Sequence, residues 1–395
     1  MTNHIAFYQF CSAVRRKGAL ALCLALCMMG LALSASAQKP RIITFDAPGA
    51  GSAAAGQGTF PYDINTEGAI TGEYGDAGWW WHGFVRTPDG RIKTFDAPGT
   101  SPVANTGTQP ISINPAGAIA GSYWYYQESG PYGCNSFLRA PDGTFTTFEA
   151  PGALWTYAGN INPAGTIAGD YQDTSYVYHG FVRAPDAVIT PFDVTPTFPD
   201  PAPGTEPWQG TYTSLSSALN PEGAITGYYI DAGWVYHGFV RAPDGRFKTF
   251  DAPGVGTTEA EMGTYPQSIN PEGTITGYFW DANWVGHGFL RTRDGRITTF
   301  DAPGAGADPG STEGTFPMAI NANGTITGYL QDTKWLTHGF SRSPDGKFTT
   351  FDVPGEGTVP GTWEGTWPMR INANGTITGG YNDSSGVYHG FLRIP

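Results

Sequence analysis

Cysteine is scarce in this chain, and its distribution limits how the fold can be stabilised. Three of the four cysteines, Cys11, Cys23 and Cys27, lie near the N-terminus, and only Cys134 follows them. The body of the chain therefore cannot form an internal disulfide bond. Cys134 precedes Asn135 rather than a histidine, and no activating partner is evident, so we expect an unreactive thiol. Stability must come from core burial, for which 395 residues are ample.

Basic residues are also few. The chain has 21 Lys and Arg against 34 Asp and Glu, which gives a formal net charge of −13. Such an acidic protein is not expected to bind nucleic acid or an anionic membrane without a local basic patch.

The chain has one long apolar run, from Ala19 to Leu33, and it lies near the N-terminus. A basic block, Arg15 to Lys17, precedes it, and Ala35-Ser36-Ala37 follows it. This order is typical of a secretory signal peptide. The run is short for a membrane span, although an uncleaved anchor is the alternative. We predict a signal peptide over residues 1–37, a single domain over residues 38–395 without a membrane span, and a secreted, extracellular or periplasmic bacterial protein.

Helical periodicity is absent outside this segment, and three short signatures recur instead. The first is Ile-Asn-x-x-Gly-x-Ile-x-Gly, with Leu for the first Ile in the fourth copy; its asparagines are Asn65, Asn114, Asn162, Asn220, Asn270, Asn321 and Asn372. The second is His-Gly-Phe-x-Arg, whose histidine is replaced by Asn135 in the second copy. The third is Thr-Phe-Asp-x-Pro-Gly, with Glu149 and Asp193 at the Asp position of its degenerate copies. These signatures define seven repeats of about fifty residues.

Each repeat is predicted to form four strands. In the fifth repeat these are 265–270, 274–279, 286–292 and 296–301, separated by turns rich in Asn, Pro, Asp and Gly. Four short strands per repeat are typical of a β-propeller, so we predict an all-β, seven-bladed propeller with four antiparallel strands per blade. Residues 41–46 read as a fourth strand without a preceding repeat, and the last repeat stops after its third strand. We therefore predict that the N-terminal strand completes the last blade and closes the ring.

The Ile-Asn-x-x-Gly-x-Ile-x-Gly and His-Gly-Phe-Leu-Arg units resemble the HAF-type extracellular repeats of bacteria, with Gly at the Ala position of His-Ala-Phe. The resemblance covers nearly all of the chain after residue 37. It implies secretion and a propeller-like fold, but no established activity, so the catalytic residues stay unknown.

The recurring histidines and aspartates are predicted to pair across the hairpin of strands three and four. Counting outward from Pro88-Asp89-Gly90 places each histidine opposite an aspartate. The predicted pairs are His82 with Asp96, His237 with Asp251, His287 with Asp301, His338 with Asp352 and, through ring closure, His389 with Asp46. Catalytic dyads or metal ligands are one interpretation. We prefer structural hydrogen bonds without a metal, because a reaction needs one site whereas a fold needs every blade held.

Ligand-binding candidates gather in the connections between strands two and three and between strands four and one, which lie on one face. This face is acidic and holds the tryptophans, which suits a neutral saccharide or a cationic peptide. The candidates are Trp79, Trp80, Trp124, Tyr125, Tyr126, Glu128, Glu206, Trp208, Trp234, Trp284, Glu313, Trp335, Trp363 and Glu364. The alternative is that these aromatics only pack between blades. Ca²⁺ is a further alternative, although an Asp-x-Asp-x-Asp-Gly loop is absent, and otherwise no cofactor is expected.

Three functions remain open. The preferred one is a monomeric, secreted binding propeller, because the repeats are regular and no catalytic motif is present. A secreted glycoside hydrolase would need two suitably spaced carboxylates, which sequence spacing cannot establish. A structural cell-envelope protein without a small ligand is the third.

Overall fold

The computed structural model describes residues 40–126, 132–196, 200–213, 218–362 and 364–395. The predicted signal peptide, residues 1–37, lies outside these ranges. Residues Ile42–Ile394 form one compact unit. The described residues contain 28 strands and no helix, so no helix among them could span a membrane.

The strands pair antiparallel in consecutive groups of four. The first three groups are β2(Gly58–Ile64), β3(Ile70–Gly75), β4(Trp81–Arg86), β5(Ile92–Phe95); β6(Gly107–Ile113), β7(Ile119–Tyr125), β8(Gly133–Arg139), β9(Phe145–Phe148); and β10(Trp155–Ile161), β11(Ile167–Gln172), β12(Tyr178–Arg183), β13(Ile189–Phe192). The next three are β14(Gly210–Thr213), β15(Ile225–Ile230), β16(Tyr236–Arg241), β17(Phe247–Phe250); β18(Thr264–Ile269), β19(Ile275–Trp280), β20(Gly286–Arg291), β21(Ile297–Phe300); and β22(Gly314–Ile320), β23(Ile326–Gln331), β24(Thr337–Arg342), β25(Phe348–Phe351). The last described group is β26(Thr366–Ile371), β27(Ile377–Asn382), β28(Tyr388–Ile394) and β1(Arg41–Phe45).

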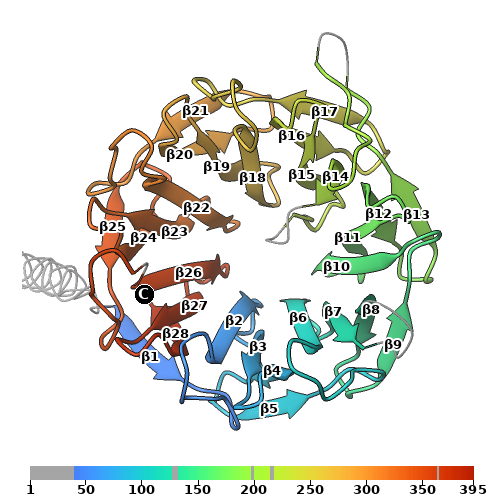
Figure 1. Ribbon diagram of the computed structural model, residues 1–395, viewed down its shortest axis with the longest axis vertical. Coiled ribbons are helices and arrows are strands. Elements are labelled where there is room, and N and C mark those ends of the chain that lie inside the picture. Colours follow the sequence, from blue (N-terminus) through green and yellow to red (C-terminus); the bar gives the residue numbers. More distant parts are fainter. Residues whose placement is uncertain (1–39, 127–131, 197–199, 214–217, 363) are drawn as a thin grey trace, which may run out of the picture. The chain divides into compact units, whose positions relative to one another are not determined.

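Within Ile42–Ile394 these groups lie around a common axis (Figure 1). The first strand of each group lies nearest the axis and the fourth lies at the rim, as β2 and β5 show in Figure 1. This is the architecture of a β-propeller, so the prediction of an all-β propeller is confirmed.

The His-Gly-Phe motif is explained by packing within each blade. Phe84 is completely buried, and its counterparts are equally buried: Phe137, Phe181, Phe239, Phe289, Phe340 and Phe391. The preceding glycine leaves room for the ring of the fourth strand, because a Cβ on Gly83 would lie only 2.5 Å from the Phe95 ring. The motif therefore buries one phenylalanine on one face of strand three and fits another against the glycine.

The closure prediction is confirmed. Strand β1 pairs with β28 although they lie at opposite ends of the chain. His389 Nδ1 lies 2.9 Å from Asp46 Oδ1, and the Phe45 ring packs on Gly390. Ile42 packs against the core of the last blade, so the early strand supplies both backbone pairing and apolar contact.

The recurring asparagine joins neighbouring blades. Asn65 Nδ2 donates to the carbonyl oxygen of Asn114 at 3.1 Å, while Asn65 Oδ1 accepts from the backbone N–H of Ala69 at 2.8 Å. The buried side chain thus closes its own turn and fixes the next blade. Equivalent inter-blade bonds start from Asn114, Asn220, Asn270, Asn321 and Asn372.

Candidate functional site in the central channel

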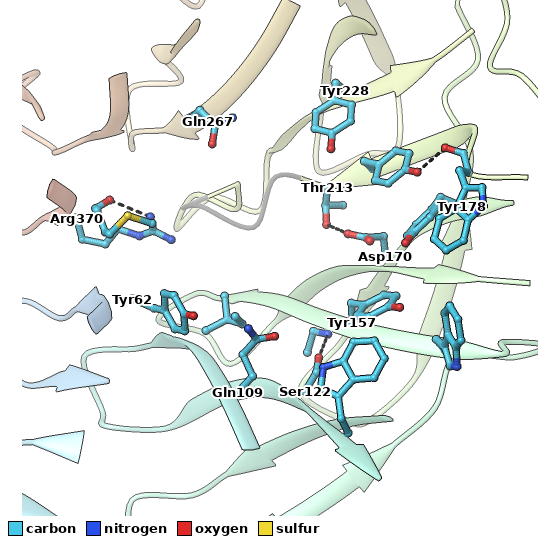
Figure 2. A pocket seen from close by; sticks show the side chains of 17 residues that line it. Tyr62, Gln109, Ser122, Tyr157, Asp170, Tyr178, Thr213, Tyr228, Gln267 and Arg370 are labelled. Carbon is cyan, nitrogen blue, oxygen red and sulfur yellow. Dashed lines mark hydrogen bonds between the residues drawn. The ribbon is translucent and has the colours of Figure 1, made fainter. Parts of the chain in front are cut away.

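Side chains of the inner strands line a pocket of about 870 Å³ within the channel. Figure 2 shows it from close by. Its lining comes mainly from the first four blades, with Gln267, Met369 and Arg370 from later ones. The aromatic members are Tyr62, Trp124, Trp155, Tyr157, Tyr178, Trp208, Tyr212 and Tyr228.

The aromatic rings form a continuous wall across the third and fourth blades. Tyr178 stacks on Tyr212 with ring centroids 4.1 Å apart, and Tyr212 stacks on Tyr228 at 5.0 Å. Trp208 lies between Trp155, at 6.5 Å, and Tyr178, at 6.3 Å. Because the rings brace one another, their side chains are held in position, which lowers the cost in side-chain entropy of binding a ligand.

Asp170, on β11, is the acidic residue of this pocket. Its side chain is 5% exposed, and its Oδ1 accepts a hydrogen bond from Thr213 Oγ1 at 2.9 Å (Figure 2). Burial raises the pKa of Asp170 to about 7, although the bonds from Thr213 oppose this effect. No ion pair joins Asp170 to a basic side chain in the described ranges. The pocket therefore holds a carboxylate whose charge has no counter-ion among them.

Arg370 is the basic residue of the lining, and it has a carboxylate partner. Its Nε lies 3.6 Å from Asp63 Oδ1, and its Nη1 donates to the carbonyl oxygen of Met369 at 3.0 Å. Asp63 also accepts hydrogen bonds from Ser112 Oγ and from the backbone N–H of Ile113. Figure 2 shows Arg370 on the opposite side of the opening from Asp170.

A second buried carboxylate lies in an adjoining cavity of about 200 Å³. The Tyr62 hydroxyl donates to Glu73 Oε1 at 2.6 Å, and burial raises the pKa of Glu73 to about 7. Gln109 and Trp124 line both cavities, so Glu73 is a neighbour of the central pocket rather than part of its wall.

The structure brings two of the predicted ligand residues, Trp124 and Trp208, into the pocket. Tyr126 is 51% exposed, and neither it nor Tyr125 lines the pocket. Glu206 is exposed in the loop that precedes Trp208. The predicted residues Glu128 and Trp363 lie outside the described residues.

Four predicted tryptophans occupy left-handed turn positions between strands two and three. Their φ values are 63° for Trp79, 64° for Trp234, 60° for Trp284 and 65° for Trp335. Gly386 has the equivalent position in the last blade, with φ of 75°. These side chains, like Trp80 beside them, are part of the turns and do not line the central pocket.

The predicted candidates Glu313 and Glu364 are buried in the connections between strands four and one. Glu364 Oε2 accepts a hydrogen bond from the backbone N–H of Val359 at 2.8 Å. Glu313 is 1% exposed and closely approaches Gly306. Both side chains lie within their own loops and outside the pocket lining.

The predicted register of the His–Asp pairs is confirmed. The histidine Nδ1 lies between 2.8 and 3.1 Å from the aspartate, as in His82 with Asp96 and His237 with Asp251. A second aspartate, which the sequence argument missed, lies near Nε2; an example is Asp76 at 3.7 Å. Its Oδ1 accepts backbone N–H groups of the turn, including that of Trp80 at 2.9 Å. These acids therefore shape the turns and contact the histidines.

One group of the described residues has a geometry that could hold a metal ion. His338, Asp352 and Glu356 bring one potential ligand atom each within 4.8 Å of one another. The Thr366 hydroxyl donates to Glu356, and burial raises the pKa of Glu356 to about 7. His338 and Asp352 make the same bond as their counterparts in other blades, so the added feature is Glu356 alone.

Cys134 is completely buried, and burial raises the pKa of its thiol. Its Sγ lies 3.8 Å from the carbonyl oxygen of Thr156. A protonated, inaccessible thiol is a poor nucleophile.

Some of the pocket residues that sequence reasoning missed lie at one position of the repeat, which is detectable in the sequence. The residue after the second glycine of the Ile-Asn signature varies, although the residue before it is always glycine. It is Glu73, Ser122, Asp170, Tyr228, Tyr278, Tyr329 and Gly380 in successive repeats. Three of these, Ser122, Asp170 and Tyr228, line the pocket.

Comparisons with known proteins gave structural neighbours only. No family model and no curated protein matches the chain. Dipeptidyl peptidase 4 of Porphyromonas gingivalis has a TM-score of 0.44 at 9% identity, with 74% of this chain and 45% of that chain covered. AofleA of Arthrobotrys oligospora has a TM-score of 0.43 at 13% identity, with 81% and 92% covered. The Aleuria aurantia lectin, a mutant solved with alpha-methyl-L-fucoside, has a TM-score of 0.39 at 12% identity, with 81% and 95% covered. The chain thus spans less than half of the peptidase.

Proposed function

We propose that this chain is an exported binding propeller that holds a saccharide in its central pocket. The observation that carries the proposal is the aromatic wall of Tyr178, Tyr212, Tyr228 and Trp208, which lines a cavity of about 870 Å³. Ligand pockets in proteins typically have volumes of about 300–1,000 Å³ and combine apolar walls with a few polar groups.

The polar groups of the pocket suit sugar hydroxyls. Tyr62, Gln109, Thr213 and Gln267 line the pocket with hydroxyl and amide groups (Figure 2), and Trp208, which is 48% exposed, contributes an indole ring. Sugar rings have apolar faces and polar edges, so stacking and hydrogen bonding can act together. The basic and apolar pattern of residues 15–37 supports export, and the repeated His-Gly-Phe-x-Arg motif supports membership of the HAF-type repeats.

A glycoside hydrolase is the second candidate, and the two buried carboxylates favour it. Asp170 and Glu73 both have a pKa raised to about 7 by burial, as a general acid requires. The parent protein would then hydrolyse the bound saccharide, and both Asp170→Asn and Glu73→Gln would lose this activity. That result would support a hydrolase over a protein that only binds the saccharide.

The test of binding is calorimetric titration with a panel of neutral and amino oligosaccharides. We expect a saturable signal that Trp208→Ala weakens at least tenfold. Trp284→Ala, on a turn outside the pocket, is the matched control and should bind as the parent protein does. Absence of binding across the panel, or equal loss in both variants, would overturn the proposal.

A further inference from the structure

We propose that the central pocket selects a saccharide that carries a protonated amine, with Asp170 as the partner of the ammonium group. This inference rests on the proposed function and specifies its ligand class. It comes from a difference between Asp170, the acidic residue of the lining, and Arg370, the basic residue on the opposite side of the pocket: only Arg370 has an oppositely charged partner among the described residues.

Arg370 lies beside an acidic side chain, whereas no basic side chain of the described residues forms an ion pair with Asp170. Arg370 lies 3.6 Å from Asp63, which is itself fixed by Ser112. In the described part of the chain, Asp170 has hydrogen bonds from Thr213 but no ion pair. Because a buried charge is costly without a partner, a cation at this position would gain more than a neutral group.

The aromatic residues around Asp170 add to this preference. Asp170 lies close enough to the hydroxyls of Tyr157, Tyr178, Tyr212 and Tyr228 to oppose their ionisation, in addition to the larger effect of burial. A phenolic oxygen can accept a hydrogen bond from an ammonium N–H. A carboxylate beside several tyrosine hydroxyls therefore provides a group of hydrogen-bond acceptors for a protonated amine.

Binding of an ammonium group should be linked to the ionisation of Asp170. The other titratable groups near it are Cys134 on β8 and the tyrosines on β10, β12, β14 and β15; burial raises the pKa of each. These groups stay neutral near pH 7, so Asp170 is the one that titrates there. An ammonium ion favours the carboxylate, so affinity for the amine should rise as pH rises through about 7.

The experiment compares two tetramers that differ in acetylation of the amines and therefore in charge: N-acetylglucosamine tetramer, which is neutral, and the fully deacetylated glucosamine tetramer. Calorimetry at pH 5.5 and 6.8 keeps a substantial protonated fraction of the amines while changing the ionisation of Asp170. We expect the deacetylated tetramer to bind at least tenfold more tightly than the acetylated one at pH 6.8, with a smaller preference at pH 5.5.

The variant Asp170→Asn should abolish the preference for the amine while it retains the thermal stability of the fold. Glu356→Gln is the matched control, because burial also raises the pKa of Glu356 to about 7 but this residue does not line the pocket, and it should keep the preference. Equal affinity for both tetramers, or an unchanged preference in Asp170→Asn, would overturn the inference.

A third ligand, trilysine, separates an amino sugar from a cationic peptide. Binding of trilysine but of neither tetramer would overturn the saccharide class. If neutral sugars of the wider panel bind and both trilysine and the deacetylated tetramer do not, the inference fails and the proposed function stands. If no saccharide binds, the proposed function fails as well.

Discussion

The side-chain amide of Asn372 donates a hydrogen bond to the main-chain carbonyl of Asn65, 3.1 Å away in space and 307 positions earlier in the sequence. The same side chain accepts from the backbone N–H of Thr376, within its own turn. It therefore joins the last blade to the first, while β1, which pairs with β28 in the last blade, continues along the chain into β2 of the first blade.

Replacement of this asparagine should destabilise the closed ring. We expect Asn372→Ala to lower the free energy of unfolding by about 1–3 kcal/mol, because buried backbone groups lose their partners. Asn374→Ala removes an exposed bond from the same turn and should cost less than about 0.5 kcal/mol. Urea unfolding of both variants makes the comparison, and equal losses would argue against a special role for the closing bond.

Removal of β1 should open the ring. A chain that starts at Ala47 loses the apolar contacts of Ile42 and Phe45 and leaves β28 with an unpaired edge. Open edges recruit other chains, so we expect a melting temperature at least 5 °C lower, on the order of 1–2 kcal/mol or more, and concentration-dependent association. A chain that starts at Pro40 is the control. If light scattering and thermal melts are the same for the two chains, β1 is not needed to close the ring.

Stability should depend on pH through Asp170 and Glu73. Their folded pKa values, about 7, lie above the ordinary values of 3.8 and 4.5, so the folded state binds more protons between about pH 4 and 7. The stability that this proton binding contributes is present at low pH and is lost as pH rises through 7. For Asp170 the difference corresponds to about 4 kcal/mol at most.

The measurement is urea unfolding at pH 5, 6, 7 and 8 for the parent and the double variant Asp170→Asn, Glu73→Gln. We expect the double variant to show a flatter dependence on pH across this range. Glu356, whose pKa is also about 7, contributes in the same direction and leaves a residual slope. An unchanged slope in the double variant would show that these groups do not titrate as the structure indicates.

The thiol of Cys134 should be unreactive in the folded protein. In a chain that starts at Pro40 it is the one remaining cysteine, and it is completely buried with a raised pKa. We expect no reaction with a thiol reagent under native conditions and one equivalent in denaturant. Rapid labelling of the native protein would mean that β8 and β10 separate readily.

Much of the fold could be predicted from the sequence because its determinants are local and repeated. The hairpin at Pro88-Asp89-Gly90 sets which residues of strands three and four face each other, and this placed His82 opposite Asp96. The same counting on His389 placed Asp46 in the last blade. Turn chemistry and strand alternation act within a few residues, so strand register can be predicted from them without knowledge of the rest of the fold.

The lining of the pocket could not be predicted by counting along hairpins, because it depends on a bulge and on contacts between blades. Strand β2 has a bulge between Pro61 and Asp63, which changes the direction of the side chains that follow. Tyr62 therefore reaches the pocket and Glu73, while Asp63 meets Arg370 from the last blade. Likewise, this counting did not show that Asp76 caps its own turn and lies near His82.

The sequence by itself determined the repeating four-stranded unit, its strand register and the closing partner of its N-terminal strand, because these follow from short-range turn geometry and apolar alternation. Only the tertiary structure decided that Asp170 is buried among tyrosines from neighbouring blades and that Arg370 has its own carboxylate. The physical reason is that burial and charge pairing depend on contacts between residues far apart in the chain, which the ring brings together only once it has closed.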